Sequence, residues 1–422
     1  MSLSQLFPSP LRRAYGRITY GRTRLRDFVR KIGVRTIDLR RTLMGGEGPF
    51  DARPWAEMTG EPRRASMPLC ESPHVRLLEQ YRVVGDALFD WKHFRRTPYF
   101  QNAARAVQFC GSYFGHRTHD GIADQARAFV SLYRRALDAD ATEVVFTHPG
   151  AHSPAGSLPA VRETLTPNTF QVSDGHHRLA VAWMLRRQDV AAAVVGPPSA
   201  TALQSLVLAC AQTQGRRELY QPIDSVEFDG AWHVVRRCDD RLAMILDFLR
   251  TAGRPLPGAS VLDLGCSYGW FVSQFSRRGA AATGVDADDT ALRVGRIAYG
   301  LGPEHLIQSD VLSFLSAGTR KWDVVLLLSL LHHFALGRTP GSAADLLARI
   351  DRVTGSWLFL DTGQSHERWW HGALSEWNAD AIARFIRTHT SFSRVVPLGT
   401  DGDHAGRYRG NYGRTLFACT RP

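Results

Sequence analysis

The chain has 422 residues, of which 44% are hydrophobic and 22% charged, and its net charge is +12. These values are typical of globular proteins and exclude a chain that is disordered throughout, while the length predicts two or three domains. The six cysteines form no CxxC pair or zinc-ligand spacing, and no run approaches the ~18 apolar residues of a membrane helix. We therefore expect no zinc site and a cytoplasmic location.

Residues 1–68 are predicted to form a basic arm followed by a linker. The first 41 residues carry eleven Arg or Lys side chains against two acidic ones, and Gly and Pro interrupt the chain between positions 45 and 62. We expect one or two short helices and an irregular connection after them. Arginine far outnumbers lysine, which fits a GC-rich coding bias as well as phosphate binding. Nucleic acid is therefore a possible partner that the charge alone does not favour.

Residues 69–235 are predicted to hold a helical segment and a small α/β domain. Apolar residues recur with helical spacing from Ser72 to Ala136. After it the pattern predicts, in chain order, strands at 143–146 and 169–174, a helix at 176–187, a strand at 190–195, a helix at 202–212 and an extended segment at 232–237.

The turn after the second predicted strand carries the sequence DGHHR. The strand ends at Asp174, Gly175 turns the chain, and His176, His177 and Arg178 open the helix. Free N–H groups at a helix start, the helix dipole and an arginine side chain converge at such a turn. These five residues are therefore a candidate site for phosphate or a nucleotide.

This unit resembles the ParB/sulfiredoxin superfamily, whose members carry a Gly-x-His-Arg-type turn that grips nucleotide phosphates. The resemblance covers about residues 140–197 and rests on the pentapeptide. It implies that Gly175, His177 and Arg178 contact the phosphates of ATP or another nucleotide with magnesium. It also implies that Asp174 orients the loop or a metal, and that Glu143 could act as a base, as in kinase relatives. The alternative is that the histidines are structural and the unit serves packing or acceptor docking.

From residue 236 to 422 the chain alternates strands and helices in a third predicted domain. A helix at 239–253 precedes VLDLGCSYGWF (261–271), in which a buried strand runs into a glycine turn and then a helix. The next strand ends at Asp286, about 20 residues past the turn, where a carboxylate can accept both ribose hydroxyls. Later strands end at Asp310, Ser329 and Asp361, and a predicted hairpin closes the chain.

This combination resembles the class I S-adenosylmethionine-dependent methyltransferases. The resemblance implies an α/β, Rossmann-like fold with a seven-stranded sheet and an antiparallel last strand. It implies that Asp263 and Gly265 hold the methionine end of S-adenosyl-L-methionine, that Asp286 binds the ribose and that Asp310 binds the adenine amine. Cys266, Ser267, Gly269 and Ser329 complete the predicted cofactor-binding set, with Ser267 standing where many relatives have glycine. The alternative, a nicotinamide-binding Rossmann domain, usually shows all three glycines and lacks the closing hairpin.

Two histidines follow the fourth strand of this domain. His332 and His333 lie where the resemblance puts the methyl-transfer site, and a histidine there can act as a base. The alternative is that one packs on the cofactor and the other caps a helix. The stretch QSHERWWHGALSEW is expected either to line the acceptor pocket or to form an amphipathic helix with tryptophans in the core; its residues of interest are His366, Glu367, Trp369, Trp370 and His371.

These observations predict a methyltransferase that acts on an oxygen of a carbohydrate-like, phosphorylated or other small polar acceptor. The strand end LSLLHHF and the QPIDS and WHVVRR lead-in are similar to the kinase–methyltransferases that cap bacterial O-antigen polysaccharides, but no protein-kinase-like domain is evident. One alternative is an RNA methyltransferase using the basic arm, although NPPY-type and RNA-binding motifs are missing. Another is a non-catalytic nucleotide-sensing module on a cofactor-bound scaffold. The oligomeric state is left open.

Overall fold

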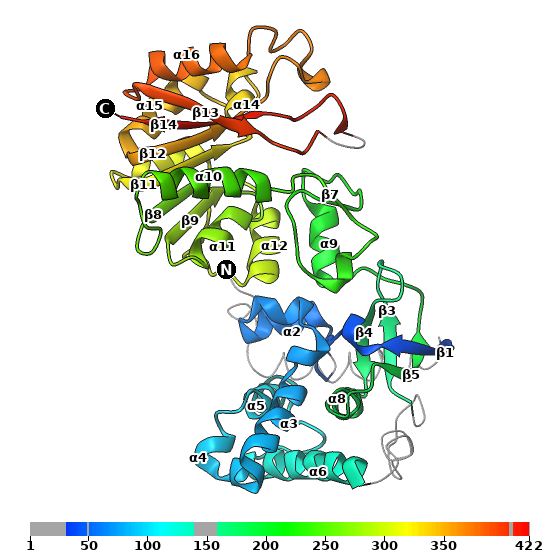
Figure 1. Cartoon of the computed structure of the whole chain (residues 1–422). Helices are drawn as coiled ribbons and strands as arrows, with labels where there is room; N and C mark the ends of the chain where they lie inside the picture. The colour runs from blue at the N-terminus through cyan, green and yellow to red at the C-terminus, as the bar shows by residue number, and fades with distance from the viewer. Residues whose placement is uncertain (1–30, 49, 139–157, 405–407, 422) are drawn as a thin grey trace. The chain divides into compact units, whose positions relative to one another are not determined.

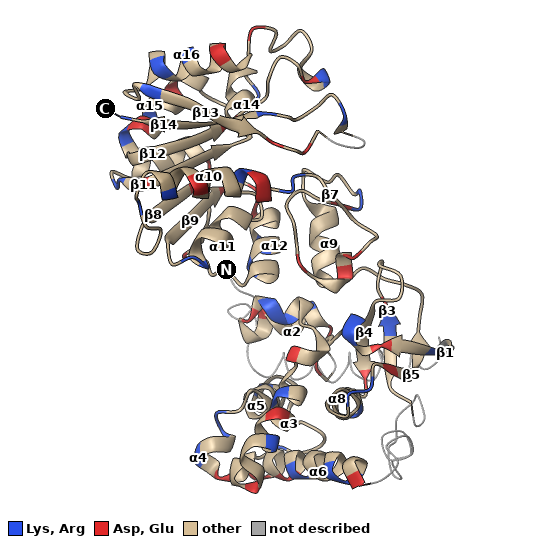
Figure 2. Ribbon diagram, in the orientation of Figure 1, with Lys and Arg blue, Asp and Glu red and all other residues tan. Residues whose placement is uncertain are grey.

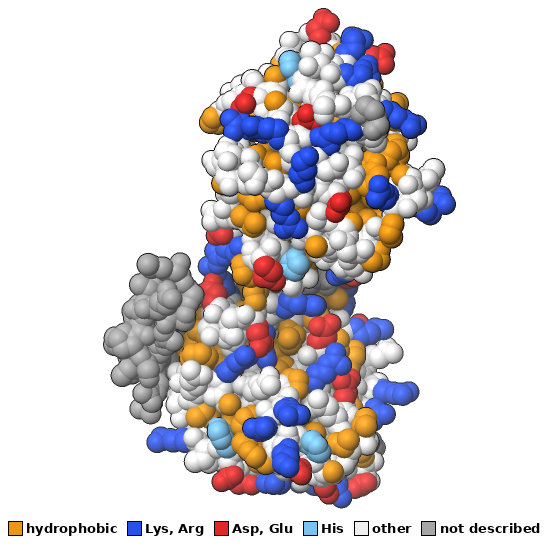
Figure 3. All heavy atoms as spheres, turned by 90° about the vertical axis from the view of Figure 1, so that its left-hand side faces the viewer, with side chains coloured by type: hydrophobic (Ala, Val, Ile, Leu, Met, Phe, Trp, Pro, Cys, Tyr) orange, Lys and Arg blue, Asp and Glu red, His pale blue; other side chains and the backbone are white. Residues whose placement is uncertain are grey.

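The protein is described by a computed structural model that covers residues 31–48, 50–138, 158–404 and 408–421, and it divides into two compact units (Figure 1). The N-terminal unit extends to Ser205 and includes Asp224–Ala231, and the C-terminal unit holds Leu206–Ile223 and the chain from Trp232 onward. No helix in the described ranges is both long and apolar enough to cross a membrane. Within each unit, basic and acidic residues are interspersed along the ribbon of Figure 2, and basic side chains stand among acidic ones on the face seen in Figure 3.

The N-terminal unit is built on a five-stranded sheet of order β1-β5-β3-β4-β2. Its strands are β1 (Lys31–Asp38), β2 (Thr42–Leu43), β3 (Ala160–Glu163), β4 (Phe170–Asp174) and β5 (Asp189–Val195). β1 pairs antiparallel with β5, and β2 pairs parallel with β4. The predicted arm of residues 1–68 needs correction here, because Lys31–Asp38 and Thr42–Leu43 form strands of this sheet. The segment KIGVRTID is rich in β-branched residues, which favour a strand, whereas the prediction weighed only its charge.

The helices of this unit are α2 (Ala52–Thr59), α3 (Pro73–Val84), α4 (Trp91–Phe94), α5 (Pro98–Cys110), α6 (His119–Asp138) and α8 (His176–Met184). They share a core of their own, and α8 also contributes Leu179 and Ala182 to the core of the sheet. The predicted helical segment between Ser72 and Ala136 is thereby confirmed, with an aromatic core that includes Trp55, Phe94 and Phe129. The predicted strand at 143–146 and its Glu143 lie outside the described residues.

The C-terminal unit contains a seven-stranded sheet of order β10-β9-β8-β11-β12-β14-β13. The strands are β8 (Ser260–Leu264), β9 (Ala281–Asp286), β10 (Leu306–Gln308), β11 (Trp322–Leu328), β12 (Thr354–Asp361), β13 (Arg394–Thr400) and β14 (Thr415–Thr420). The first five are parallel, and β14 runs antiparallel between β12 and β13. This order and the closing hairpin confirm the predicted class I architecture.

Both faces of this sheet are covered by helices (Figure 1). Successive strand residues such as Val261 and Leu262 point to opposite faces and enter separate cores. One face carries α13 (Val311–Ala317), α14 (Leu331–Ala335), α15 (Ala343–Val353) and α16 (Ala379–His389), and the other carries α10 (Asp239–Thr251), α11 (Trp270–Ser276) and α12 (Asp289–Tyr299).

The strand order reverses between β8 and β11, which creates a crevice at their carboxyl ends. A lead-in with α9 (Ala202–Ala209), β6 (Glu218–Leu219) and β7 (His233–Val234) precedes α10. The predicted boundary at 235/236 assigned Leu206–Ile223 to the middle domain, whereas the contacts group it with the C-terminal unit. The reason is local: Gln221 accepts a hydrogen bond from Trp270 N (3.2 Å) and donates one to the carbonyl of Cys266 (3.2 Å).

Candidate active site

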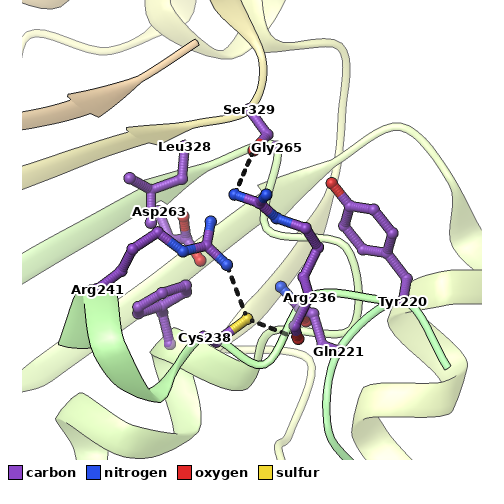
Figure 4. A pocket seen from close by; sticks show the side chains of 10 residues that line it. Tyr220, Gln221, Arg236, Cys238, Arg241, Asp263, Gly265, Leu328 and Ser329 are labelled. Atoms are coloured by element: carbon purple, nitrogen blue, oxygen red, sulfur yellow. Dashed lines mark hydrogen bonds between the residues drawn. The ribbon is translucent and has the colours of Figure 1, made fainter. Parts of the chain in front are cut away.

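A cavity opens at the carboxyl ends of β8 and β11, at the point where the strand order reverses. The lead-in and the start of α10 supply its remaining walls, so that segments more than 100 residues apart meet there (Figure 4). The cavity is lined by Tyr220, Gln221, Arg236, Cys238, Arg241, Asp263, Gly265, Phe271, Leu328 and Ser329. Three predicted cofactor residues, Asp263, Gly265 and Ser329, therefore share one cavity.

The glycine turn after β8 brings backbone close to this cavity. Gly265 has a φ of +74°, and a Cβ there would meet Leu330 at 3.1 Å. A Cβ on Gly269, with a φ of +80°, would meet Leu306 at 2.6 Å, and the positive φ favours glycine at both positions. Ser267 also has a positive φ, of 53°, which explains why a glycine would suit this position. Cys266 is buried within the same turn.

Asp263 places a buried carboxylate in the cavity. Its side chain is 2% exposed, and its Oδ2 has no hydrogen-bond partner among the described residues. Burial, aided by the nearby charge of Asp286, raises the pKa of Asp263 to about 7. A buried carboxylate without a partner suits a cationic ligand group, which would compensate its lost hydration.

Arg236 faces the same cavity and belongs to a buried charge cluster. Its Nη2 lies 3.1 Å from Asp401 Oδ2, and its Nε lies 3.3 Å from Asp403 Oδ2. Arg241 joins the cluster by donating to Asp361 Oδ2 at 3.0 Å. The Nη1 of Arg236, however, has no partner within the described part of the chain. Figure 4 shows Arg236, Arg241 and Asp263 pointing toward a common space from different elements.

These two unpartnered groups fit the methionine end of S-adenosylmethionine, which carries an ammonium and a carboxylate. Asp263 would meet the ammonium, and the free edge of Arg236 would meet the carboxylate. Sequence reasoning identified Asp263 but missed Arg236, Arg241 and Gln221. The only local signal for the arginines is their occurrence beside apolar residues in WHVVRR and DDRLAM.

The other predicted cofactor residues lie at neighbouring strand ends. Asp286 accepts hydrogen bonds from the backbone N–H groups of Ser267 (2.8 Å) and Asp288 (2.9 Å), and burial raises its pKa. Each of its oxygens has a further lone pair for a ribose hydroxyl. Asp310 is exposed and caps α13 through Ser313 N at 2.9 Å, so its adenine-binding role stays a prediction. The N–H of Ser329 donates to Asp361 Oδ1 at 2.8 Å.

The two predicted catalytic histidines differ in their surroundings. His332 is 3% exposed, its Nδ1 accepts from Gly363 N at 3.2 Å, and burial lowers its pKa to about 2. Because Nδ1 is occupied as an acceptor, its proton resides on Nε2. His333 is half-buried, 4.3 Å away by ring centroids, and burial with the charge of Arg338 lowers its pKa. His333 is therefore neutral near pH 7 and is the better placed of the two to accept a proton.

The stretch after β12 folds as a loop with a short 3-10 turn, η7 (Arg368–Trp370), so the alternative of an amphipathic helix is wrong. Glu367 holds it in place, because this fully buried carboxylate accepts from Arg414 Nε (2.8 Å) and Nη2 (2.9 Å). His366 contacts the carbonyl of Tyr412, and Trp370 is 7% exposed and contacts the ring of His332. Glu367 and Trp370 are thus structural, and His371 is exposed.

In the N-terminal unit, the DGHHR residues meet at the start of α8. Gly175 has a φ of +93°, and Arg178 Nη2 lies 3.5 Å from Asp174 Oδ2. His176 Nε2 lies 2.8 Å from the carbonyl of Met44. His177 Nε2 lies 2.8 Å from the hydroxyl of Tyr99, and burial lowers its pKa to about 3. Both histidines thus have partners within the protein, as the structural alternative expects.

Sequence reasoning missed His74 of α3, which stacks on His176 at 5.3 Å and contacts His177 edge-on at 4.9 Å. Burial lowers the pKa of both His74 and His177, so these two imidazoles are uncharged at neutral pH. What remains for an anion at this turn is the first-turn backbone of α8 and the Arg178 guanidinium.

Comparison with known proteins supports the assignment of the C-terminal unit. Residues 261–354 match the family model described as a methyltransferase domain. A 166-residue stretch is 29% identical to the O-antigen chain terminator bifunctional methyltransferase/kinase WbdD of Escherichia coli, and covers 37% of this chain and 22% of that protein. A stretch of 112 residues is 30% identical to the ubiquinone biosynthesis O-methyltransferase of Nitrosomonas europaea, and covers 24% of this chain and 43% of that one.

A crystal structure of WbdD is similar to this chain with a TM-score of 0.41 and 23% identity, over 52% of this chain and 46% of that one. The chain thus spans less than half the length of these relatives. The C-terminal unit is an S-adenosylmethionine-dependent methyltransferase domain, as the sequence predicted.

Proposed function

We propose that the protein methylates an oxygen of a carbohydrate-like or other small polar acceptor, and that its N-terminal unit binds phosphate or a nucleotide. The observation that carries the first part is the cavity with an unpartnered carboxylate, Asp263, and an unpartnered guanidinium edge, Arg236. Similarity to an O-antigen chain terminator and to an O-methyltransferase supports an oxygen acceptor that can be a glycan.

When bound, S-adenosylmethionine supplies a methyl group on a sulfonium, which an acceptor oxygen attacks in line. The chain's own contribution is then to orient the acceptor and to remove its proton. His333 takes that proton on a ring nitrogen, because it is neutral at pH 7 and only half-buried. The ring of His332 packs against that of His333 and so positions it. His332 also holds the loop after β12 by accepting a hydrogen bond from Gly363 N.

Replacing the histidines separately tests this division of roles. His333→Ala should lower kcat by ~10²–10⁴-fold while leaving the affinity for S-adenosylhomocysteine unchanged. His389→Ala, at the end of α16, is the matched control and should retain wild-type turnover. A His333→Ala enzyme with wild-type kcat at every pH between 6 and 9 would remove the base assignment.

The N-terminal proposal rests on the start of α8. The helical bonds begin with Leu179 N donating to Gly175 O at 3.0 Å, so the N–H groups of residues 176–178 lie in the first turn, beside Arg178. Arg178→Ala should weaken binding of ATP with magnesium and spare S-adenosylhomocysteine. The control is Arg187→Ala, an exposed arginine just beyond the same helix. Equal ATP affinities for wild type and Arg178→Ala would leave this unit a packing or acceptor-docking element.

A further inference from the structure

Trp369 has an exposed aromatic ring that belongs to neither hydrophobic core of the C-terminal unit. It is 48% exposed, and among the described residues of the C-terminal unit it is the one large hydrophobic side chain with such exposure. Its neighbour Trp370, by contrast, is 7% exposed. An exposed tryptophan that a fold holds in one orientation is a recognisable binding element, because it offers a wide apolar face at low entropic cost.

The backbone around Trp369 is fixed from two sides. Its N–H donates to Asn411 Oδ1 at 3.1 Å, and the preceding Arg368 N–H donates to Gly410 O at 2.9 Å. The ring meets Tyr412 edge-on at 5.1 Å and Tyr408 at 6.0 Å. The loop after β12 and the β13–β14 connection thus present one aromatic surface, and both project from the same end of the sheet (Figure 1).

A chain of contacts joins this surface to the methyl-transfer site. The guanidinium of Arg236 lies over the ring of Tyr412, 4.3 Å from its centroid. Arg236 also lines the cofactor cavity. On the other side, Trp370 lies 5.0 Å from His332, next to the proposed base His333. Trp369 is thus linked to the cofactor cavity through Tyr412 and to the proposed base through its neighbour Trp370.

We propose that Trp369, flanked by Tyr408, is the stacking subsite for a sugar ring of the acceptor, an inference that rests on the proposed function. One face of a pyranose presents several C–H groups with partial positive charge, which match the negative face of an indole ring. Its hydroxyls remain in water or meet polar groups, as an exposed platform requires. Arg338, exposed and 4.7 Å over Trp370, provides a cation for an anionic substituent.

An acceptor with a long apolar tail fits this surface less well. Its tail would need a continuous apolar patch, whereas Trp369 is the one large aliphatic or aromatic side chain so exposed in the described C-terminal unit. The small area of the platform matches a single ring.

The test uses the full chain, saturated with S-adenosylhomocysteine, and saturation-transfer NMR with mannotriose, maltotriose and catechol as probes. Wild type should transfer saturation to ring C–H protons of a trisaccharide, and Trp369→Ala should lose most of it. Trp369→Phe should retain it, since the aromatic face remains. Trp91→Ala removes a similarly exposed tryptophan (45%) from the N-terminal unit and is the matched control.

The companion measurement is turnover with S-adenosylmethionine and the same probes. For a sugar acceptor, Trp369→Ala should raise KM by ~10-fold with kcat and cofactor affinity within ~3-fold of wild type. The subsite would be overturned if Trp369→Ala turned over a sugar with the wild-type KM. It would also be overturned if the wild-type protein showed no saturation transfer to either trisaccharide. Turnover of catechol alone would instead overturn the carbohydrate acceptor in the proposed function.

Discussion

Lowering the pH should weaken S-adenosylhomocysteine binding, because Asp263 takes up a proton near neutrality. Burial raises its pKa to about 7, and a bound ammonium would favour its ionised form. Below pH 7, binding must first remove this proton, so the affinity should fall up to tenfold per pH unit. At pH 5.5 the expected loss relative to high pH is about 30-fold, or ~2 kcal/mol.

Isothermal titration at pH 5.5, 6.5, 7.5 and 8.5 measures this loss directly. Repeating the pH 6 titration in buffers of different ionisation enthalpy counts the protons released, and about 0.9 per ligand is expected one unit below the pKa. The amino group of the ligand stays charged throughout this range, so the proton comes from the protein.

Asp263→Asn is the control, because it keeps the shape of the side chain and cannot ionise. It should bind ~10–100-fold more weakly at pH 8.5, as expected for a lost charged hydrogen bond, with a flatter pH profile. The pKa of Asp286 is also raised by burial, so any slope left in this variant reports on that group. A wild-type affinity that is constant from pH 5.5 to 8.5, or equal slopes in both proteins, would refute the assignment of Asp263.

Three further predictions concern stability, each measured by urea unfolding. Ser267→Gly should raise the free energy of unfolding by about 0.5–1 kcal/mol, because φ is +53° there, and it should leave cofactor affinity intact. Arg414→Met should cost ~3–5 kcal/mol by leaving Glu367 buried without its partner, and adding Glu367→Gln should recover most of that loss. Glu227 is fully buried, accepts hydrogen bonds from Ser66 and Thr201, and has a pKa raised by burial. Since folding then favours its protonated form, its stabilising contribution is lost as pH rises through the folded pKa, and Glu227→Gln should stabilise the protein at pH 8 but not at pH 4.

The sheet and its glycine turn could be predicted because their signals are local. A buried strand, a turn that needs positive φ and a carboxylate at the next strand end all fall within VLDLGCSYGWF and the residues up to Asp286. The same pattern showed that Ser267 stands where many relatives have glycine. The left-handed backbone of Ser267 explains why glycine suits that position.

The charge cluster in the cofactor cavity could not be predicted in this way. Arg236 and Arg241 owe their position to Asp361, Asp401 and Asp403, which lie at least 120 residues further along the chain. Hydrophobic periodicity reports on elements, and ion pairs formed across a folded sheet leave no local pattern.

The N-terminal strands were missed for a different reason. Charge dominated the interpretation of residues 31–38, although their β-branched side chains favour a strand and Ile37 is fully buried. At α8 the sequence correctly placed a turn and a helix. It could not show that His176 and His177 would find partners in Met44 and Tyr99, which precede them by more than 75 residues.

The central claim is that the cavity at the carboxyl ends of β8 and β11 holds the methionine end of the cofactor between Asp263 and Arg236. Titrating the wild-type protein with S-adenosylhomocysteine and with 5′-methylthioadenosine, which lacks the amino-acid group, tests it without any substitution. One molecule of S-adenosylhomocysteine should bind per chain, and 5′-methylthioadenosine should bind at least ~100-fold more weakly, since two charged contacts are lost. Equal affinities, or no binding of S-adenosylhomocysteine, would contradict the account.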